Sequence, residues 1–172
     1  MGITLIAPVG QRGEDASRFR RPAGLTIRPC ARADTDALGP LYFTAYEPGE
    51  ARAYLAASVA DIAASFNGEY GDLWSAASPV AMERDVIVGT LLTVRRAAWE
   101  PAPPCPYIIE LFTARTHRRR GIARALLAAC SATLLADGED AVALSVEPSS
   151  VAARHLYDAA GFTPSADTFG LG

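Results

Sequence analysis

Residues 113–127, TARTHRRRGIARALL, place an arginine-rich turn directly before a segment with helical spacing. Ile122, Leu126, Cys130 and Leu134 recur every fourth residue, which predicts a helix with one buried face that begins after the glycine of the turn. The first turn of a helix carries N–H groups without an intrahelical acceptor and a partial positive charge. Because glycine lets the backbone approach a ligand closely, the stretch predicts a site for an anion, most readily a diphosphate.

The segments on both sides of this stretch alternate between strand and helix patterns. Residues 107–113, YIIELFT, predict a strand immediately before the turn. Further strands are predicted at residues 3–9, 25–29, 78–84, 86–94 and 141–146, and further helices at about residues 34–45, 50–66 and 150–160. In the helix at 50–66 we expect Tyr54 and Leu55 to face the core. The pattern is that of an α/β fold.

Two ordered motifs in the second half of the chain resemble those of a known family. Arg118-Arg119-Arg120-Gly121-Ile122-Ala123 fits Arg/Gln-x-x-Gly-x-Gly/Ala, the acyl-CoA-binding signature of the GNAT superfamily of N-acetyltransferases. Leu144-Ser145-Val146, followed by Ala153, Leu156-Tyr157 and Gly161-Phe162, resembles its second signature, with Ser150 where the family has Asn. The resemblance implies a GNAT fold, with a mixed central β-sheet flanked by helices on both faces. It also implies transfer of an acetyl group from acetyl-CoA directly to a primary amine, without a metal.

The resemblance assigns the residues that would bind acetyl-CoA. The pantetheine arm would pair like an extra strand with the backbone of Leu111, Phe112 and Thr113. The diphosphate would lie on the amides of Arg118, Arg119, Arg120, Gly121, Ile122 and Ala123. The three arginine side chains would add cations beside it. Ser150 would cap its helix and make one bond to the pantetheine arm, with a shorter reach than Asn.

Tyr157 and Glu110 are the candidate catalytic residues. By its position in the family motif, Tyr157 would donate a proton to the departing thiolate, although a tyrosine at helical spacing is also an ordinary core residue. Glu110 is a carboxylate in an apolar strand, where burial would raise its pKa and suit it to act as base. A salt-bridged or edge-exposed glutamate remains an alternative, and a bulge in this strand would decide which way Glu110 faces.

The acceptor is expected near the first two helices, as in the family. This region holds aromatic and acidic residues that would suit a cationic amine on a small molecule or a peptide. They are Tyr42, Tyr46, Glu47, Glu50, Tyr54, Phe66, Glu69, Tyr70, Asp72 and Trp74. Many of them would equally serve as core aromatics or surface acids, so no acceptor residue is assigned.

Residues 1–23 are interpreted as an N-terminal extension and residues 24–172 as the GNAT domain. In the family, a further strand follows the Gly-Phe motif and lies beside the strand equivalent to residues 141–146, but here the sequence stops at Gly172. We hypothesise that residues 3–9 occupy that position, in their own subunit or swapped from a partner. The polar segment 11–21 has little to bury, which predicts a flexible connector.

Composition narrows the classes of protein. The net charge of −3 and the pI of about 5.4 argue against a nucleic-acid binder built on residues 115–120. The basic N-terminal region of a secretory signal and a long apolar run are absent from the sequence, so we expect a cytoplasmic protein without a membrane partner. The spacing of its three cysteines and two histidines does not suggest a metal site. A non-catalytic acyl-CoA-binding sensor or interaction module remains an alternative, and the family is compatible with a homodimer.

Overall fold

The central element is a mixed β-sheet. The computed structural model describes residues 2–10, 20–47, 50 and 52–166. Its strands lie in the order β2 (Leu25–Pro29), β3 (Pro79–Glu83), β4 (Val86–Val94), β5 (Tyr107–Thr113), β6 (Ala141–Val146), β1 (Ile3–Pro8) and β7 (Thr163–Pro164). Of these pairs, β5 and β6 run parallel and the others antiparallel. The expected α/β architecture with a mixed sheet is therefore confirmed.

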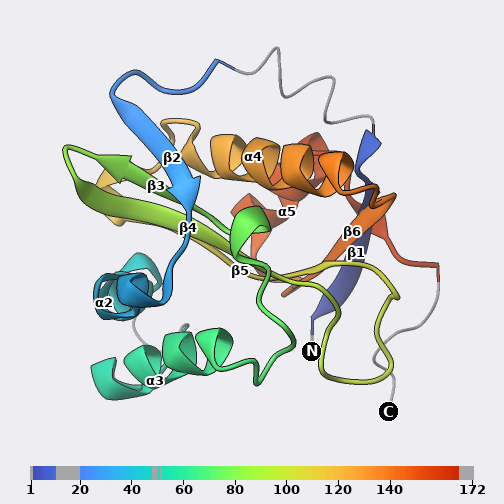
Figure 1. Cartoon of the computed structure of the whole chain (residues 1–172), viewed down its shortest axis with the longest axis horizontal. Helices are drawn as coiled ribbons and strands as arrows, with labels where there is room; N and C mark the ends of the chain where they lie inside the picture. Colours follow the sequence, from blue (N-terminus) through green and yellow to red (C-terminus); the bar gives the residue numbers. More distant parts are fainter. Residues whose placement is uncertain (1, 11–19, 48–49, 51, 167–172) are drawn as a thin grey trace.

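Helices cover both faces of the sheet, as Figure 1 shows. Helices α2 (Thr35–Ala45) and α3 (Leu55–Phe66) lie on one face, and α4 (Ile122–Ala136) and α5 (Val151–Ala159) on the other. Short 3₁₀ helices occupy Arg32–Asp34, Ser75–Ala77 and Arg115–His117. The long loop of residues 95–106 connects β4 to β5. It lies on the α3 side of the sheet (Figure 1).

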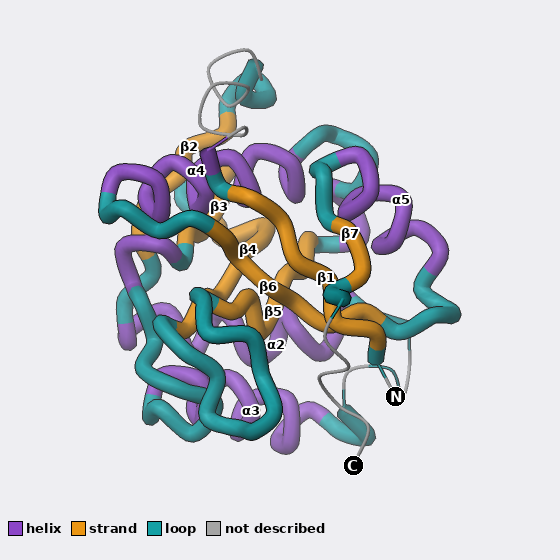
Figure 2. The backbone as a smooth tube through the Cα atoms, turned by 90° about the vertical axis from the view of Figure 1, so that its right-hand side faces the viewer, coloured by secondary structure: helices purple, strands orange, loops and turns teal. Residues whose placement is uncertain are grey.

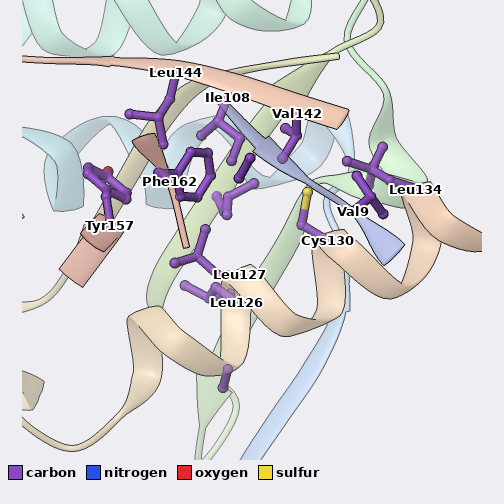
Figure 3. Packing of buried hydrophobic residues seen from close by; sticks show 14 of the residues in the cluster. Val9, Ile108, Leu126, Leu127, Cys130, Leu134, Val142, Leu144, Tyr157 and Phe162 are labelled. Atoms are coloured by element: carbon purple, nitrogen blue, oxygen red, sulfur yellow. The ribbon is translucent and has the colours of Figure 1, made fainter. Parts of the chain in front are cut away.

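The apolar face of α4 forms the main core with the sheet. Ile122, Leu126, Cys130 and Leu134 are all at most 2% exposed, which confirms the face predicted from their spacing. Figure 3 shows Cys130 directed toward Val142 of β6 and Leu134 beside Val9. Burying each large aliphatic side chain contributes about 1.5–3 kcal/mol, so this face fixes the position of α4 firmly. The first turn of α4 is held in place by the same contacts.

Helix α3 begins later than the sequence pattern predicted. It starts at Leu55 rather than near Glu50, and Tyr54 precedes it in an extended conformation with φ −154°. Tyr54 is 62% and Leu55 is 47% exposed, so the expectation that they face the core was wrong. The face that packs on α2 begins with Ser58 and Ile62, both fully buried. Because no side chain caps the start of α3, the sequence carried no local signal for the first residue of the helix.

Strand β1 lies between β6 and β7, although it is first in the sequence (Figure 2). It pairs antiparallel with β6 from Ile3 opposite Val146 to Pro8 opposite Ala141. The strand expected beside residues 141–146 is thus present and belongs to the same chain. A two-residue strand, β7, does follow the Gly-Phe motif, contrary to expectation, and it pairs with β1 rather than β6. Most of the predicted flexible connector, residues 11–19, lies outside the described residues.

Strands β5 and β6 separate soon after they meet. Their parallel pairing covers only Tyr107 opposite Ala143 and Ile108 opposite Leu144, so the rest of β5 has no partner in β6. On its other side β5 pairs with β4, and the register shifts so that Leu92 faces Glu110 and Thr93 faces Ile108. Ile109 is the extra residue of a β-bulge. The bulge and the separation occur at the same point, which opens the middle of the sheet.

Candidate active site

The turn before α4 presents backbone N–H groups to solvent. Arg119 and Gly121 both have left-handed backbone angles, with φ of 60° and 78°. Left-handed residues in such a turn aim neighbouring N–H groups into one concavity that suits an anion. Gly121 is the N-cap residue of α4 and supplies no side-chain acceptor, and the first turn contains no acidic residue. These N–H groups and the helix dipole therefore polarise the start of α4 positively, which is what the predicted anion site requires.

A pocket of about 670 Å³ lies in front of this turn. We call it the helix-start pocket. Its lining comes from the end of α2, from β5, from the turn with the start of α4, and from α5. The lining residues are Ala45, Tyr46, Leu111, Phe112, Thr113, His117, Arg118, Arg119, Gly121, Ile122, Ala123, Arg124, Ala152, Ala153, Leu156 and Tyr157. Most of the predicted cofactor-binding residues thus meet Tyr157 in one pocket.

The unpaired part of β5 offers backbone hydrogen-bonding groups to the helix-start pocket. The N–H of Ala114 donates to Val88 O at 2.8 Å. Because hydrogen-bonded and non-bonded pairs alternate in an antiparallel ladder, Leu111 and Thr113 direct their backbone groups away from β4. The hydroxyl of Tyr46 donates to Leu111 O at 3.3 Å, which places that carbonyl on the pocket side. An extended ligand could pair with this edge as an added strand.

Tyr157 lies at the inner end of the helix-start pocket. Its ring contacts Phe162 edge-on at a centroid distance of 5.5 Å, and the residue is 8% exposed. Figure 3 shows the two side chains next to each other. Burial, together with the negative charge of Glu110, raises the pKa of its hydroxyl to about 12. Tyr157 therefore keeps its proton at neutral pH.

Glu110 lines a second pocket of about 640 Å³, which we call the carboxylate pocket. Its lining residues are Gly2, Thr4, Tyr42, Arg52, Asp61, Ser65, Tyr70, Trp99, Glu100, Pro101, Pro103, Tyr107, Ile108, Ile109, Glu110 and Ser145. Burial and the negative charge of Asp61 raise the pKa of Glu110 to about 8, against the opposing effects of a hydrogen bond from Tyr42 and the charge of Arg52. Near neutral pH, Glu110 can therefore both take up and release a proton.

The two pockets meet at the bulge of β5. Residues Tyr107–Glu110 line the carboxylate pocket, and residues Leu111–Thr113 line the helix-start pocket. The charge of Glu110 raises the pKa of Tyr157, which indicates that the two groups interact across this boundary. A carboxylate from one pocket and a protonated phenol from the other thus lie near the same opening in the sheet.

Two of the predicted site residues lie apart from this arrangement. The Arg120 guanidinium donates to Glu83 Oε2 at 2.6 Å, and Arg120 does not line the helix-start pocket. Because Arg119 has a positive φ, the chain reverses there and successive arginines point in different directions. Ser150 precedes α5 but its side chain makes no cap hydrogen bond, contrary to expectation, and Ser150 is absent from the pocket lining. The Arg118 side chain donates to Ala45 O at the end of α2.

The carboxylate pocket contains residues that the sequence interpretation missed. Of the aromatic and acidic residues considered for the acceptor, Tyr42 and Tyr70 line it, whereas Trp74 is buried under Arg95 with 4.0 Å between the guanidinium carbon and the ring centroid. Asp61 and Arg52 were not considered. Asp61 is the one charged residue in the α3 sequence LAASVADIAASF, and this could have marked it in the sequence as a candidate site residue.

The comparisons with known proteins agree with this geometry. The model of the acetyltransferase (GNAT) family matches residues 35–162. The chain therefore belongs to this family of acyltransferases, as its motifs indicated. No curated protein sequence matches the chain.

Solved structures share the fold at low identity. A GCN5-related N-acetyltransferase from Sphaerobacter thermophilus is 22% identical with a TM-score of 0.65, over 95% of this chain and 48% of that one. The chain thus spans about half the length of that protein. Aminoglycoside N-acetyltransferase AAC(6')-Iy in complex with CoA is 20% identical with a TM-score of 0.63, over 87% and 94%. PaiA N-acetyltransferase from Thermoplasma acidophilum, in complex with coenzyme A, is 14% identical with a TM-score of 0.64, over 84% and 95%.

Within the described ranges, the helices are too short or too polar for any of them to traverse a lipid bilayer.

Proposed function

We propose that this protein transfers the acetyl group of acetyl-CoA directly to a primary amine of a small molecule or a peptide. The observation that carries the proposal is the opening in the sheet at the β5 bulge, with Tyr157 on one side and Glu110 on the other. Family membership and the CoA complexes of structural neighbours support the choice of donor. The chemistry is consistent with acyl transfer in a single step, without a covalent enzyme intermediate.

Acetyl-CoA would occupy the helix-start pocket. Its diphosphate would accept hydrogen bonds from the backbone of residues 118–123, where the N-terminal dipole of α4 favours negative charge. Its pantetheine arm would pair with Leu111 and Thr113 along the free edge of β5. For that pairing, the Tyr46 hydroxyl would leave Leu111 O. The thioester would then lie at the bulge, next to Tyr157.

The acceptor amine would enter from the carboxylate pocket. Its ammonium form gives one proton to Glu110, and the neutral amine attacks the thioester carbonyl. The new C–N bond forms and the C–S bond breaks. Tyr157 donates its proton to the departing thiolate, and the second proton released by the nitrogen restores the tyrosine hydroxyl. The products are an N-acetyl amide and free coenzyme A.

Calorimetric titration with acetyl-CoA tests the donor site. Gly121 is a poor position for a test because its φ of 78° would strain any other residue. Ala123 lies in the first turn of α4 and lines the helix-start pocket, so Ala123→Glu places a carboxylate where the diphosphate is expected. A carboxylate at this helix position favours the fold, so the variant should fold normally. Acetyl-CoA affinity should fall at least about tenfold, because two like charges would be brought within a few ångström.

Two controls separate charge from other effects. Ala123→Gln has the same size as the test variant without its charge and should retain more of the affinity. Ala132→Glu puts the same charge on an exposed position farther along α4 and should bind like the unaltered protein. Absence of binding to the unaltered protein would contradict the proposal. Binding without acetyl transfer to any of a broad panel of small cationic amines would favour a sensor or interaction module.

A further inference from the structure

The carboxylate pocket contains an ion pair that the proposed reaction does not use. Arg52 Nη2 lies 2.9 Å from Asp61 Oδ1, and Arg52 Nε donates to Asp61 Oδ2 at 3.2 Å. The Tyr70 hydroxyl also donates to Asp61. The Asp61 side chain is only 9% exposed. Two N–H groups and a phenol thus hold one buried carboxylate in a fixed position in the lining of the carboxylate pocket.

Tyr42 lines the same pocket as this ion pair and Glu110. It lies on α2 in the lining of the carboxylate pocket, and its ring is held by Tyr46 and Phe112 at centroid distances of 5.5 and 5.3 Å. Burial and the negative charges of Glu110 and Asp61 raise the pKa of its hydroxyl. A packed, protonated phenol therefore lies in the same pocket as the two carboxylates.

We infer that the Arg52–Asp61 ion pair sets how readily Glu110 accepts the proton of the acceptor amine. The negative charge of Asp61 favours the protonated form of Glu110, and the positive charge of Arg52 limits that effect. The inference rests on the proposed role of Glu110 as base. It assigns to two residues outside the reacting atoms the control of the pH range in which the enzyme would work.

Among the described residues, Asp61 and Arg52 are the charged groups that act on the pKa of Glu110. The phenols on which the charge of Glu110 acts are Tyr42 of α2, Tyr46 just after α2 and Tyr157 of α5. Burial raises the pKa of each, so they remain neutral. From β5 itself comes Tyr107, whose pKa burial also raises. Tyr70 bonds to Asp61, which raises its pKa. Glu100 lines the pocket from an exposed position, where solvent screens its charge.

The two partners of the ion pair act on Glu110 with opposite signs. The negative charge of Asp61 raises the pKa of Glu110, and the positive charge of Arg52 lowers it. Removing the charge of Asp61 should therefore lower that pKa from about 8, and removing the charge of Arg52 should raise it. A purely structural role for the pair predicts no such opposition, because both substitutions would then disturb the same contact in the same way.

The experiment measures the pKa of Glu110 directly by carbon NMR of labelled glutamate side chains, with Glu110→Gln identifying the resonance. Asp61→Asn should move the pKa down by about one unit, and Arg52→Gln should move it up by a similar amount. In the same variants, the rise of kcat/KM with pH should shift in the same two directions. Arg28→Gln is the matched control, because Arg28 pairs with Asp34 at 2.8 and 2.9 Å but lies outside the pocket lining. It should leave the pKa of Glu110 unchanged.

The NMR measurement separates this inference from the proposed function. Opposite shifts in folded variants support the inference even if no amine is acetylated, in which case the proposed function fails alone. Equal pKa values in the three proteins, or shifts of the same sign, overturn the inference even if acetyl transfer is observed. Because the pKa is read from folded protein, partial loss of stability in one variant does not change the comparison of pKa values.

Discussion

Tyr157 is the proton donor of the proposed reaction, and it is also packed in the main core. Its hydroxyl is buried at the end of the helix-start pocket, and its pKa is raised to about 12. Tyr157→Phe removes the hydroxyl and leaves the ring contact with Phe162 in place. We expect turnover to fall about 10²-fold, the range for loss of a general acid, with acetyl-CoA affinity unchanged. Steady-state kinetics and calorimetry on the same preparations test this.

The companion control is Tyr54→Phe, which alters an exposed phenol that lines neither pocket. Its turnover should equal that of the unaltered protein. If Tyr157→Phe instead weakened acetyl-CoA binding to the same extent as turnover, Tyr157 would be a binding residue and the thiolate would take its proton from elsewhere.

Single residues also show how far the sequence could define the site. Glu110 could be identified because a carboxylate in an apolar strand is unusual, and its direction was open because a bulge depends on the pairing of two strands. Asp61 and Arg52 could not be placed beside it, because they become neighbours only when α3 packs over the sheet. The arginines of the turn had the right chemistry, but a positive φ at Arg119 turned Arg120 toward Glu83.

At the scale of elements, α2 and α3 approach each other through a glycine. A Cβ added to Gly39 would lie 2.7 Å from Val59 Cγ2 and 2.9 Å from Val59 Cα. Alanine is favoured over glycine in a helix by about 1 kcal/mol, but the backbone atom cannot move aside without separating the helices. We therefore expect Gly39→Ala to lower the free energy of unfolding by about 1–2 kcal/mol in urea denaturation.

Gly10→Ala serves as the comparison, because an added Cβ there meets no atom within 4 Å. It should leave the free energy of unfolding nearly unchanged. Stabilisation by Gly39→Ala would mean that α3 can shift relative to α2, and the walls of the carboxylate pocket would then be adjustable.

Elements with strong periodicity were predictable from the sequence, and those fixed by distant partners were less so. The α4 helix was clear because its buried positions recur every fourth residue. The β3–β4 hairpin was clear because two strand-like runs, 78–84 and 86–94, follow each other directly, and in the structure Arg84 and Asp85 form its turn with positive φ. The start of α3 had no capping residue to mark it, and β7 is too short to produce a pattern, since only its pairing with β1 defines it.

At the scale of the whole molecule, β1 is an internal strand of the sheet. Leu5 lies in the core at 5% exposed, while Ile3 on the same strand is 36% exposed. Leu5→Ala should lower the free energy of unfolding by about 2–5 kcal/mol, because it leaves a cavity between β1 and the helices α4 and α5. Ile3→Ala should lower it by less than about 1 kcal/mol. Equal, small effects in chemical denaturation would show that β1 detaches without disturbing the core.

The position of β1 also has a consequence for how the chain is made. The ribosome releases β1 before any other strand, but its partners β6 and β7 come last. At roughly 5–20 residues per second, the first strand waits for several seconds with its backbone groups unpaired. During that time it is a free β-edge to which another nascent chain or a chaperone can bind. The sheet can therefore be completed only after β6 and β7 have been made, and conditions that slow synthesis between β1 and β6 lengthen the exposure of the first strand.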